Sequence, residues 1–258
     1  MICGDYRSLF VHVPKTAGQS VEHVFLRLLG LTWETRAPLL LRGNDDPRLG
    51  PPRLAHLTAA EYVSCGYLTA AEYASYFKFS FVRNPWDRIV SEYKYRRHPV
   101  TIDFKTYLFK RLPAPGWSEA YRHIIPQYDF VYDESGHLLV DFVGRFERLQ
   151  ADFDTVCSRI GIPATPLPRI NRSLEAVRPS SFRELRRRVR RAIWSRERQH
   201  TFPDYTEYYD DESREYVGHL YRKDVQAFNY AFGDQPRSAA PAASRPAVTP
   251  PRPTPGSP

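Results

Sequence analysis

The chain has 258 residues, of which 42% are hydrophobic and 26% are charged, and its formal net charge is +8. This length suits one α/β domain with a substantial core and is too short for two large domains. No apolar run reaches the roughly 18 residues that a membrane helix needs, so we expect a cytoplasmic protein without a membrane span. The three cysteines show no pairing pattern, which agrees with a reducing compartment.

The first informative element is an apolar run over residues 8–13, which predicts a buried strand that Pro14 ends. After Gly18 the apolar residues follow one helical face, at Val21, Val24, Phe25, Leu28 and Leu29. A helix therefore begins inside the loop, and its first N–H groups can bind an anion. Lys15 supplies positive charge, and Gly18 lets the backbone come close to a ligand. Further side-chain donors are Thr16, Gln19 and Ser20.

A second strand, loop and helix follow the same logic. Residues 76–82 predict a strand, Asn84 is a good N-cap, and Pro85 suits the first helical position. Arg83 at the strand exit can form bidentate bonds to a phosphate, and the hydroxyl of Ser91 can join it from the helix. The alternative is that Arg83 pairs with a nearby carboxylate and that Ser91 is a surface hydroxyl.

The first loop is not a Walker A loop, because its lysine precedes its glycine. Pro-Lys-Thr-x-Gly-x-Ser at residues 14–20, together with Arg-Asn-Pro-x-Asp-Arg-x-x-Ser at residues 83–91, resembles the PAPS-dependent sulfotransferases, in the branch of the carbohydrate sulfotransferases. Residues 140–161 and 204–232 are similar to later segments of that family. The resemblance implies an α/β, P-loop-like three-layer fold, with a central parallel sheet flanked by helices and a helical C-terminal part.

The resemblance also implies a division of labour between the two loops. The first loop would bind the 5′-phosphosulfate of PAPS, through Lys15, Thr16, Ala17, Gly18, Gln19 and Ser20. The second would bind the 3′-phosphate through Arg83 and Ser91. Two residues depart from the family pattern: Gln19 stands where threonine is common, and Ala17 stands where glycine is common, so that Ala17 would contact the ligand through its backbone.

Sulfuryl transfer needs stabilisation of the departing phosphate oxygen and a base for the acceptor hydroxyl. Lys15 fits the first role. For the base we choose His56, which lies between the two loops, where this branch often has a histidine. His12 is the rival, although it lies in the expected strand as a candidate for a buried histidine bonded to backbone. Glu61 and Asp87 are further candidates, although Asp87 fits better as a partner of its own helix N-terminus.

The expected activity is transfer of a sulfuryl group from PAPS to a hydroxyl acceptor, with a carbohydrate as the expected acceptor, giving PAP and a sulfate ester. No His-Glu-x-x-His or zinc-ribbon pattern is present, so no metal is expected. The alternatives are a P-loop-like nucleotide-dependent kinase and a non-enzymatic basic module that binds nucleotides or nucleic acid. A soluble bacterial-type enzyme is favoured over a membrane-anchored one.

Residues 1–232 form the expected sulfotransferase domain, and residues 233–258 form a tail rich in Pro, Ala and Ser that we expect to be disordered. Within the domain, residues 181–198 predict an amphipathic helix with a capping box at Ser181 and Glu184 and many outward arginines. A solvated face is the favoured interpretation, ahead of attraction of an anionic acceptor. Nucleic acid is disfavoured because aromatic residues are not interleaved with these arginines in the way that a single-strand binder needs.

Overall fold

The computed structural model describes residues 1–170 and 202–234. The expected Arg-rich helix at residues 181–198 and almost all of the expected tail lie outside these ranges. Within them, no helix combines the length and the apolar character that crossing a bilayer demands.

A sheet of four strands forms the centre of the described part of the chain, in the order β1 (Ile2–Cys3), β2 (Ser8–Val11), β3 (Phe77–Val82) and β4 (Phe142–Arg145). Strands β2, β3 and β4 run parallel, whereas the short edge strand β1 is antiparallel to β2. The predicted parallel sheet is therefore confirmed, with an antiparallel edge that the sequence did not predict. The carboxyl ends of β2 and β3 meet at one edge, because Phe10 pairs with Phe79 and Val11 with Ser80.

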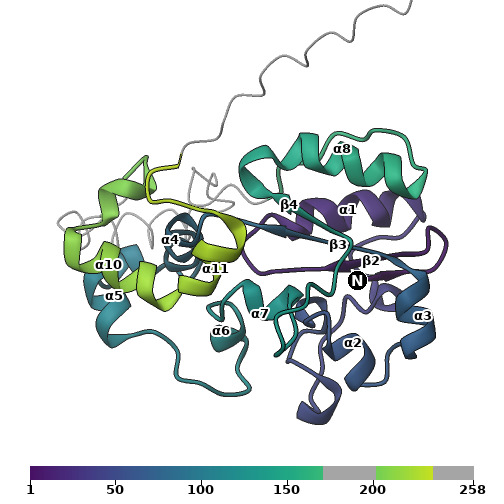
Figure 1. Ribbon diagram of the computed structural model, residues 1–258, viewed down its shortest axis with the longest axis horizontal. Helices are drawn as coiled ribbons and strands as arrows, with labels where there is room; N and C mark the ends of the chain where they lie inside the picture. Colours follow the sequence, from purple (N-terminus) through teal and green to yellow (C-terminus); the bar gives the residue numbers. More distant parts are fainter. Residues whose placement is uncertain (171–201, 235–258) are drawn as a thin grey trace, which may run out of the picture.

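Helices cover both faces of the sheet (Figure 1). On one face lie α1 (Gly18–Leu28) and α8 (Leu149–Ile160), and on the other lie α2 (Glu61–Ser64), α3 (Ala70–Ser75) and α7 (Tyr128–Val131). Neighbouring strand residues serve opposite faces, since Phe10 belongs to the α1 and α8 core, whereas Leu9 and Val11 belong to the core with α2 and α7. This arrangement confirms the three-layer α/β fold.

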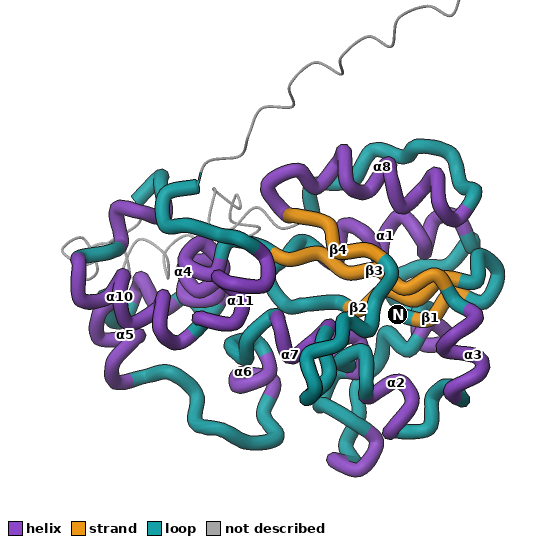
Figure 2. The backbone as a smooth tube through the Cα atoms, in the orientation of Figure 1, coloured by secondary structure: helices purple, strands orange, loops and turns teal. Residues whose placement is uncertain are grey.

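The remaining helices gather beyond the carboxyl ends of the strands (Figure 2). They are α4 (Pro85–Tyr95), α5 (Phe104–Lys110), α6 (Glu119–Arg122), α10 (Asp211–Leu220) and α11 (Arg222–Phe228). A third core, rich in aromatic residues, joins α4, α5 and α10. This core packs α4, and with it the loop before α4, against the C-terminal helices. The expected helical C-terminal part is present as α10 and α11.

The two predicted turns have the expected backbone form. The first helix begins at Gly18, four residues after Pro14. The second begins at Pro85, and Asn84 accepts a hydrogen bond from the backbone N–H of Trp86, which confirms the predicted N-cap. Both loops leave the same edge of the sheet, so both deliver their side chains to one region.

Candidate active site

A cavity of about 800 Å³ opens at the carboxyl ends of β2 and β3, and both predicted loops line it. Among the predicted site residues, those along its wall are Lys15, Ala17, Gly18, Gln19, Ser20, His56, Arg83 and Ser91. Thr16 is not among the lining residues: it is fully buried, and its hydroxyl donates to the carbonyl oxygen of Val13 at 2.8 Å. The Thr16 side chain therefore fastens the loop to the end of the strand and does not face the cavity.

The first loop holds two residues in the left-handed backbone region, Lys15 at φ 72° and Ala17 at φ 66°. A side chain with a Cβ atom is strained there, so the fold maintains this shape at a cost of roughly 1–2 kcal/mol for each residue. Ala17 precedes helix α1 and gives it no side-chain cap. The positive end of α1 is thus left to a ligand or to water.

Gly18 has a structural reason for its lack of a side chain. A Cβ atom at this position would lie 2.0 Å from Nε2 of His12, far inside van der Waals contact. The close approach of Gly18 to a ligand stays a prediction, and the structure adds that the His12 ring lies against the same backbone. Nδ1 of His12 contacts a carboxylate oxygen of Glu22 at 2.7 Å. His12 is therefore a buried histidine as expected, although its partner is a side chain and not the backbone.

The Lys15 side chain lies at the cavity with its Nζ 3.8 Å from the centre of the Tyr95 ring. Burial is the main cause that lowers the pKa of Lys15, to about 8, and the charges of Arg83 and Arg96 act in the same direction. Glu92 opposes them. Lys15 therefore loses its proton, and with it its positive charge, at a lower pH than an ordinary lysine does.

Arg83 is engaged on three sides. Its Nε and Nη2 donate to the two carboxylate oxygens of Asp87 at 2.7 and 2.8 Å, and Nη1 donates to the carbonyl oxygen of Lys15 at 3.2 Å. The pairing with a carboxylate is the alternative that the sequence left open, and it is present here. Since a guanidinium has five N–H groups, two remain for a phosphate. Asp87 stands in the first turn of α4, as expected, with its carboxylate turned to Arg83.

Two buried residues that sequence reasoning did not select hold these loops in place. Arg88 donates to the carbonyl oxygens of Pro14, His123 and Ile125. Gln127 exchanges two hydrogen bonds with the backbone of Arg83, at 2.8 and 2.7 Å, and is in turn bonded to the buried carboxylate of Asp224. Arg88 belongs to the second motif, which could have pointed to it, whereas no motif marks Gln127 or Asp224.

Three buried histidines line the cavity, His12, His56 and His123. The rings of His12 and His56 meet edge to face with centroids 4.9 Å apart, and those of His56 and His123 do so at 5.1 Å. Burial is the main cause that lowers the pKa of His56, to about 3, and the neighbouring His12 and His123 add to it while Glu119 opposes. His56 is therefore neutral at pH 7 in this structure.

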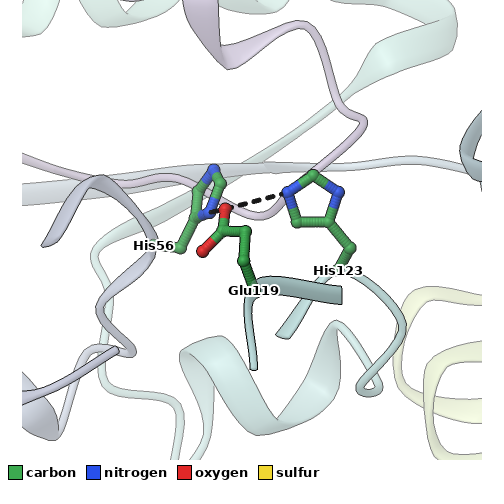
Figure 3. Close-up of side chains that lie close together, drawn as sticks. All are labelled: His56, Glu119 and His123. Carbon is green, nitrogen blue, oxygen red and sulfur yellow. Dashed lines mark hydrogen bonds and ion pairs between the residues drawn. The ribbon is translucent and has the colours of Figure 1, made fainter. Parts of the chain in front are cut away.

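Glu119 lies between His56 and His123 (Figure 3). Its Oε1 is 2.8 Å from Nδ1 of His56 and 3.1 Å from Nε2 of His123. The contact with His56 has the distance of an ion pair but not the angle of a hydrogen bond, so Nδ1 of His56 has no formed hydrogen bond among the described residues. These three residues also form the one set among the described residues whose side chains could hold a metal ion together.

The row of contacts continues beyond His123. Nδ1 of His123 lies 2.8 Å from Oε2 of Glu92, whose other oxygen accepts from Arg96 at 2.6 Å. Burial alone would raise the pKa of Glu119 and of Glu92, but the contacts with His123 outweigh it and lower the pKa of both carboxyls, with help from His56 and Arg96 respectively. No motif in the sequence marks Glu119, Glu92 or His123.

The other base candidates have partners elsewhere. The carboxylate of Glu61 forms an ion pair with Arg122 and accepts from the backbone of Thr58. Neither Glu61 nor its partner lines the cavity, and Asp87 is bound to Arg83. Of the four candidates, His12 and His56 are the two whose rings lie at the cavity beside the Lys15 loop.

The α/β fold brings both predicted loops to one cavity, which is therefore the candidate active site. A family model described as "Sulfotransferase family" matches residues 1–231, and the chain belongs to that family. An uncharacterized protein of Archaeoglobus fulgidus is 28% identical over 104 residues, covering 37% of this chain and 77% of that protein. No solved structure matches the chain.

Proposed function

We propose that the chain is a PAPS-dependent sulfotransferase that moves a sulfuryl group to a hydroxyl acceptor, releasing PAP and a sulfate ester. The observation that carries the proposal is the hydrogen bond from Arg83 to the backbone of Lys15, at 3.2 Å, on the wall of one cavity. It joins the two phosphate-binding motifs, which the sequence separates by 68 residues. Residues 1–232 are proposed as the sulfotransferase domain.

The residues present fit a ligand with phosphates at two ends. The uncapped start of α1 and the side chain of Lys15 offer donors and charge to one anionic group. Arg83 offers its remaining N–H groups to the other, together with the hydroxyl of Ser91. A cavity of about 800 Å³ is within the range that small-molecule and cofactor sites occupy.

Lys15 is proposed to stabilise the oxygen that leaves with PAP. PAPS supplies the transferable sulfuryl group, and negative charge grows on the phosphate oxygen as the bond to sulfur breaks. A preorganised cation at that oxygen lowers the barrier, since it costs no reorganisation during the reaction. In the structure Lys15 rests on Tyr95, so its side chain must turn from the ring to the donor.

His56 is proposed as the base that takes the acceptor proton, and the contacts of the three cavity histidines support this choice. Both nitrogens of His123 face carboxylates, and Nε2 of His12 is pressed against Gly18. The His56 nitrogen that faces a carboxylate is Nδ1, and Figure 3 shows the other nitrogen, Nε2, pointing away from Glu119. A neutral imidazole with an open nitrogen can accept a proton.

The acceptor is proposed to be a carbohydrate hydroxyl, on the basis of the resemblance to the carbohydrate branch. The kinase alternative has no Ser or Thr directly after a Gly-Lys pair to hold magnesium. The location proposed for the enzyme remains the cytoplasm, and no metal is assigned to the reaction.

The test is transfer of labelled sulfate from PAPS to a panel of sugars, phenols and peptides, combined with calorimetry of PAP, ATP and short oligonucleotides. We expect sulfate transfer to one of the hydroxyl compounds and binding of PAP at lower concentration than ATP. Binding of ATP or DNA without binding of PAP would refute the proposal and favour the kinase or the basic binding module.

A further inference from the structure

The row of side chains that runs from buried His56 to half-buried Arg96 has a defined order of charges. It consists of His56, Glu119, His123, Glu92 and Arg96, with neighbouring contacts of 2.8, 3.1, 2.8 and 2.6 Å. Carboxylates only accept hydrogen bonds, so both nitrogens of His123 must carry a hydrogen for both of its contacts to form. His123 is then an imidazolium between two carboxylates.

The charges of the five residues in this row cancel, and Arg53, whose Nε lies 3.7 Å from Oε1 of Glu119, adds a positive charge beside them. Arg96 and the imidazolium of His123 are positive, Glu92 and Glu119 are negative, and His56 is neutral. A metal ion bound by His56, Glu119 and His123 would have to displace the hydrogen on Nε2 of His123. The arrangement therefore favours a row of hydrogen-bonding groups over a metal centre.

We propose that Glu119 is the positioning residue for His56. Its carboxylate faces Nδ1 of His56 and so places the ring hydrogen on that nitrogen, which leaves Nε2 as the open acceptor toward the cavity. His123, held by Glu92, keeps Glu119 in place through the contact at Oε1. The proposal rests on the proposed function, in which His56 takes the acceptor proton.

The geometry explains why Glu119 acts through His56 and not on the nucleotide. Glu119 does not line the cavity, whereas both histidines that it touches do. Its second oxygen, Oε2, is buried and has no hydrogen bond among the described residues, so Glu119 can rotate slightly toward His56 when a proton moves onto that ring. The angle at Nδ1 of His56 would then close to that of a hydrogen bond.

A direct test is Glu119→Gln, which keeps the shape of the side chain and removes its charge. We expect kcat to fall by about 10- to 100-fold, with the Kd for PAP changed less than about threefold. The matched control is Glu22→Gln, which removes the carboxylate from the other buried histidine pair, His12 and Glu22. The control should keep kcat within about threefold, since His12 is not the proposed base. An equal loss of kcat in the control would overturn the proposal.

The combination with His56→Ala separates positioning from an independent effect. If Glu119 acts through His56, adding Glu119→Gln to His56→Ala lowers kcat no further. Multiplication of the two losses would overturn the positioning role. Normal activity of His56→Ala alone would instead refute the base assignment in the proposed function.

A spectroscopic readout does not depend on turnover. Nitrogen-15 NMR of the wild type at pH 7 should show His56 with its hydrogen on Nδ1, and Glu119→Gln should shift that hydrogen toward Nε2. The opposite tautomer in the wild type would overturn the proposal, even if the wild type transfers no sulfate. One equivalent of zinc that survives dialysis and is lost in Glu119→Gln would overturn it too, in favour of a metal centre.

Discussion

The turns after β2 and β3 have the same order of strand, loop and helix, but they differ in how the start of the helix is capped. The turn after β2 leaves the start of α1 without a side-chain cap and holds Lys15 and Ala17 at positive φ. The turn after β3 is capped by Asn84, and Arg83 is bound by Asp87. The start of α1 at the first turn is therefore open to an anion, whereas at the second turn Arg83 already uses three of its five N–H groups within the protein.

An anion would therefore be bound by different interactions at the two turns. At the first turn it meets uncapped N–H groups and a lysine that lies on an aromatic ring. At the second it competes with a carboxylate for part of a guanidinium. The binding energy gained at the second turn is thus the energy of the new ion pair less what the Arg83–Asp87 pair loses, so it is smaller than that of the new pair alone.

The largest expected effect separates the roles of the two turns. Lys15→Ala should lower kcat by about 10²- to 10³-fold, because it removes a charge used in the transition state. Arg83→Ala should raise the KM for PAPS by about 10- to 100-fold, with a smaller change in kcat, because it removes a bond made before and during transfer. Steady-state kinetics with labelled PAPS measures both, and circular dichroism controls for folding. Near-normal kcat in Lys15→Ala would contradict the leaving-group role.

The next effect concerns pH and the same lysine. Burial places the pKa of Lys15 at about 8, with Arg83, Arg88 and Arg96 lowering it and Glu92 raising it. Above pH 8 the free enzyme loses this positive charge, so kcat/KM for PAPS should fall about tenfold for each pH unit. Lys15→Arg stays charged across this range, and the fall should be absent at whatever activity it retains. Persistence of the fall in Lys15→Arg would assign it to another group.

The smallest effects have opposite signs at the two helix starts. Asn84→Ala should lower the free energy of unfolding by about 1 kcal/mol, because it removes the cap of α4. Ala17→Gly should raise it by up to about 1 kcal/mol, because glycine adopts positive φ without strain. Urea denaturation followed by fluorescence measures both. Destabilisation by Ala17→Gly would show that the first turn is not strained.

The sequence was sufficient for the parts of the site that are local. Pro14, Gly18, Asn84 and Pro85 set the ends of strands and helices through their own backbone preferences, so both turns were predicted close to their observed bounds. Edge strand β1 was missed, because two residues carry too short a pattern to read.

The parts that depend on distant contacts could not be read from the sequence. Glu119 reaches His56 across 63 positions and belongs to a helix of four residues with no motif. Thr16 was expected at the ligand, but a carbonyl three residues earlier takes its hydroxyl. The ion pair of Arg83 with Asp87 was predicted only as an alternative. A spacing of four residues allows Arg83 to pair with Asp87 but does not prevent it from binding a phosphate instead.

The buried guanidinium of Arg88 links two segments of the site through hydrogen bonds. It joins the carbonyl of Pro14, before the lysine loop, to the carbonyls of His123 and Ile125, beyond α6. These segments carry the proposed leaving-group cation and the residues behind the proposed base. Opening of either segment breaks a hydrogen bond to Arg88, so we expect both to exchange amide hydrogens at similar rates, as one cooperative unit.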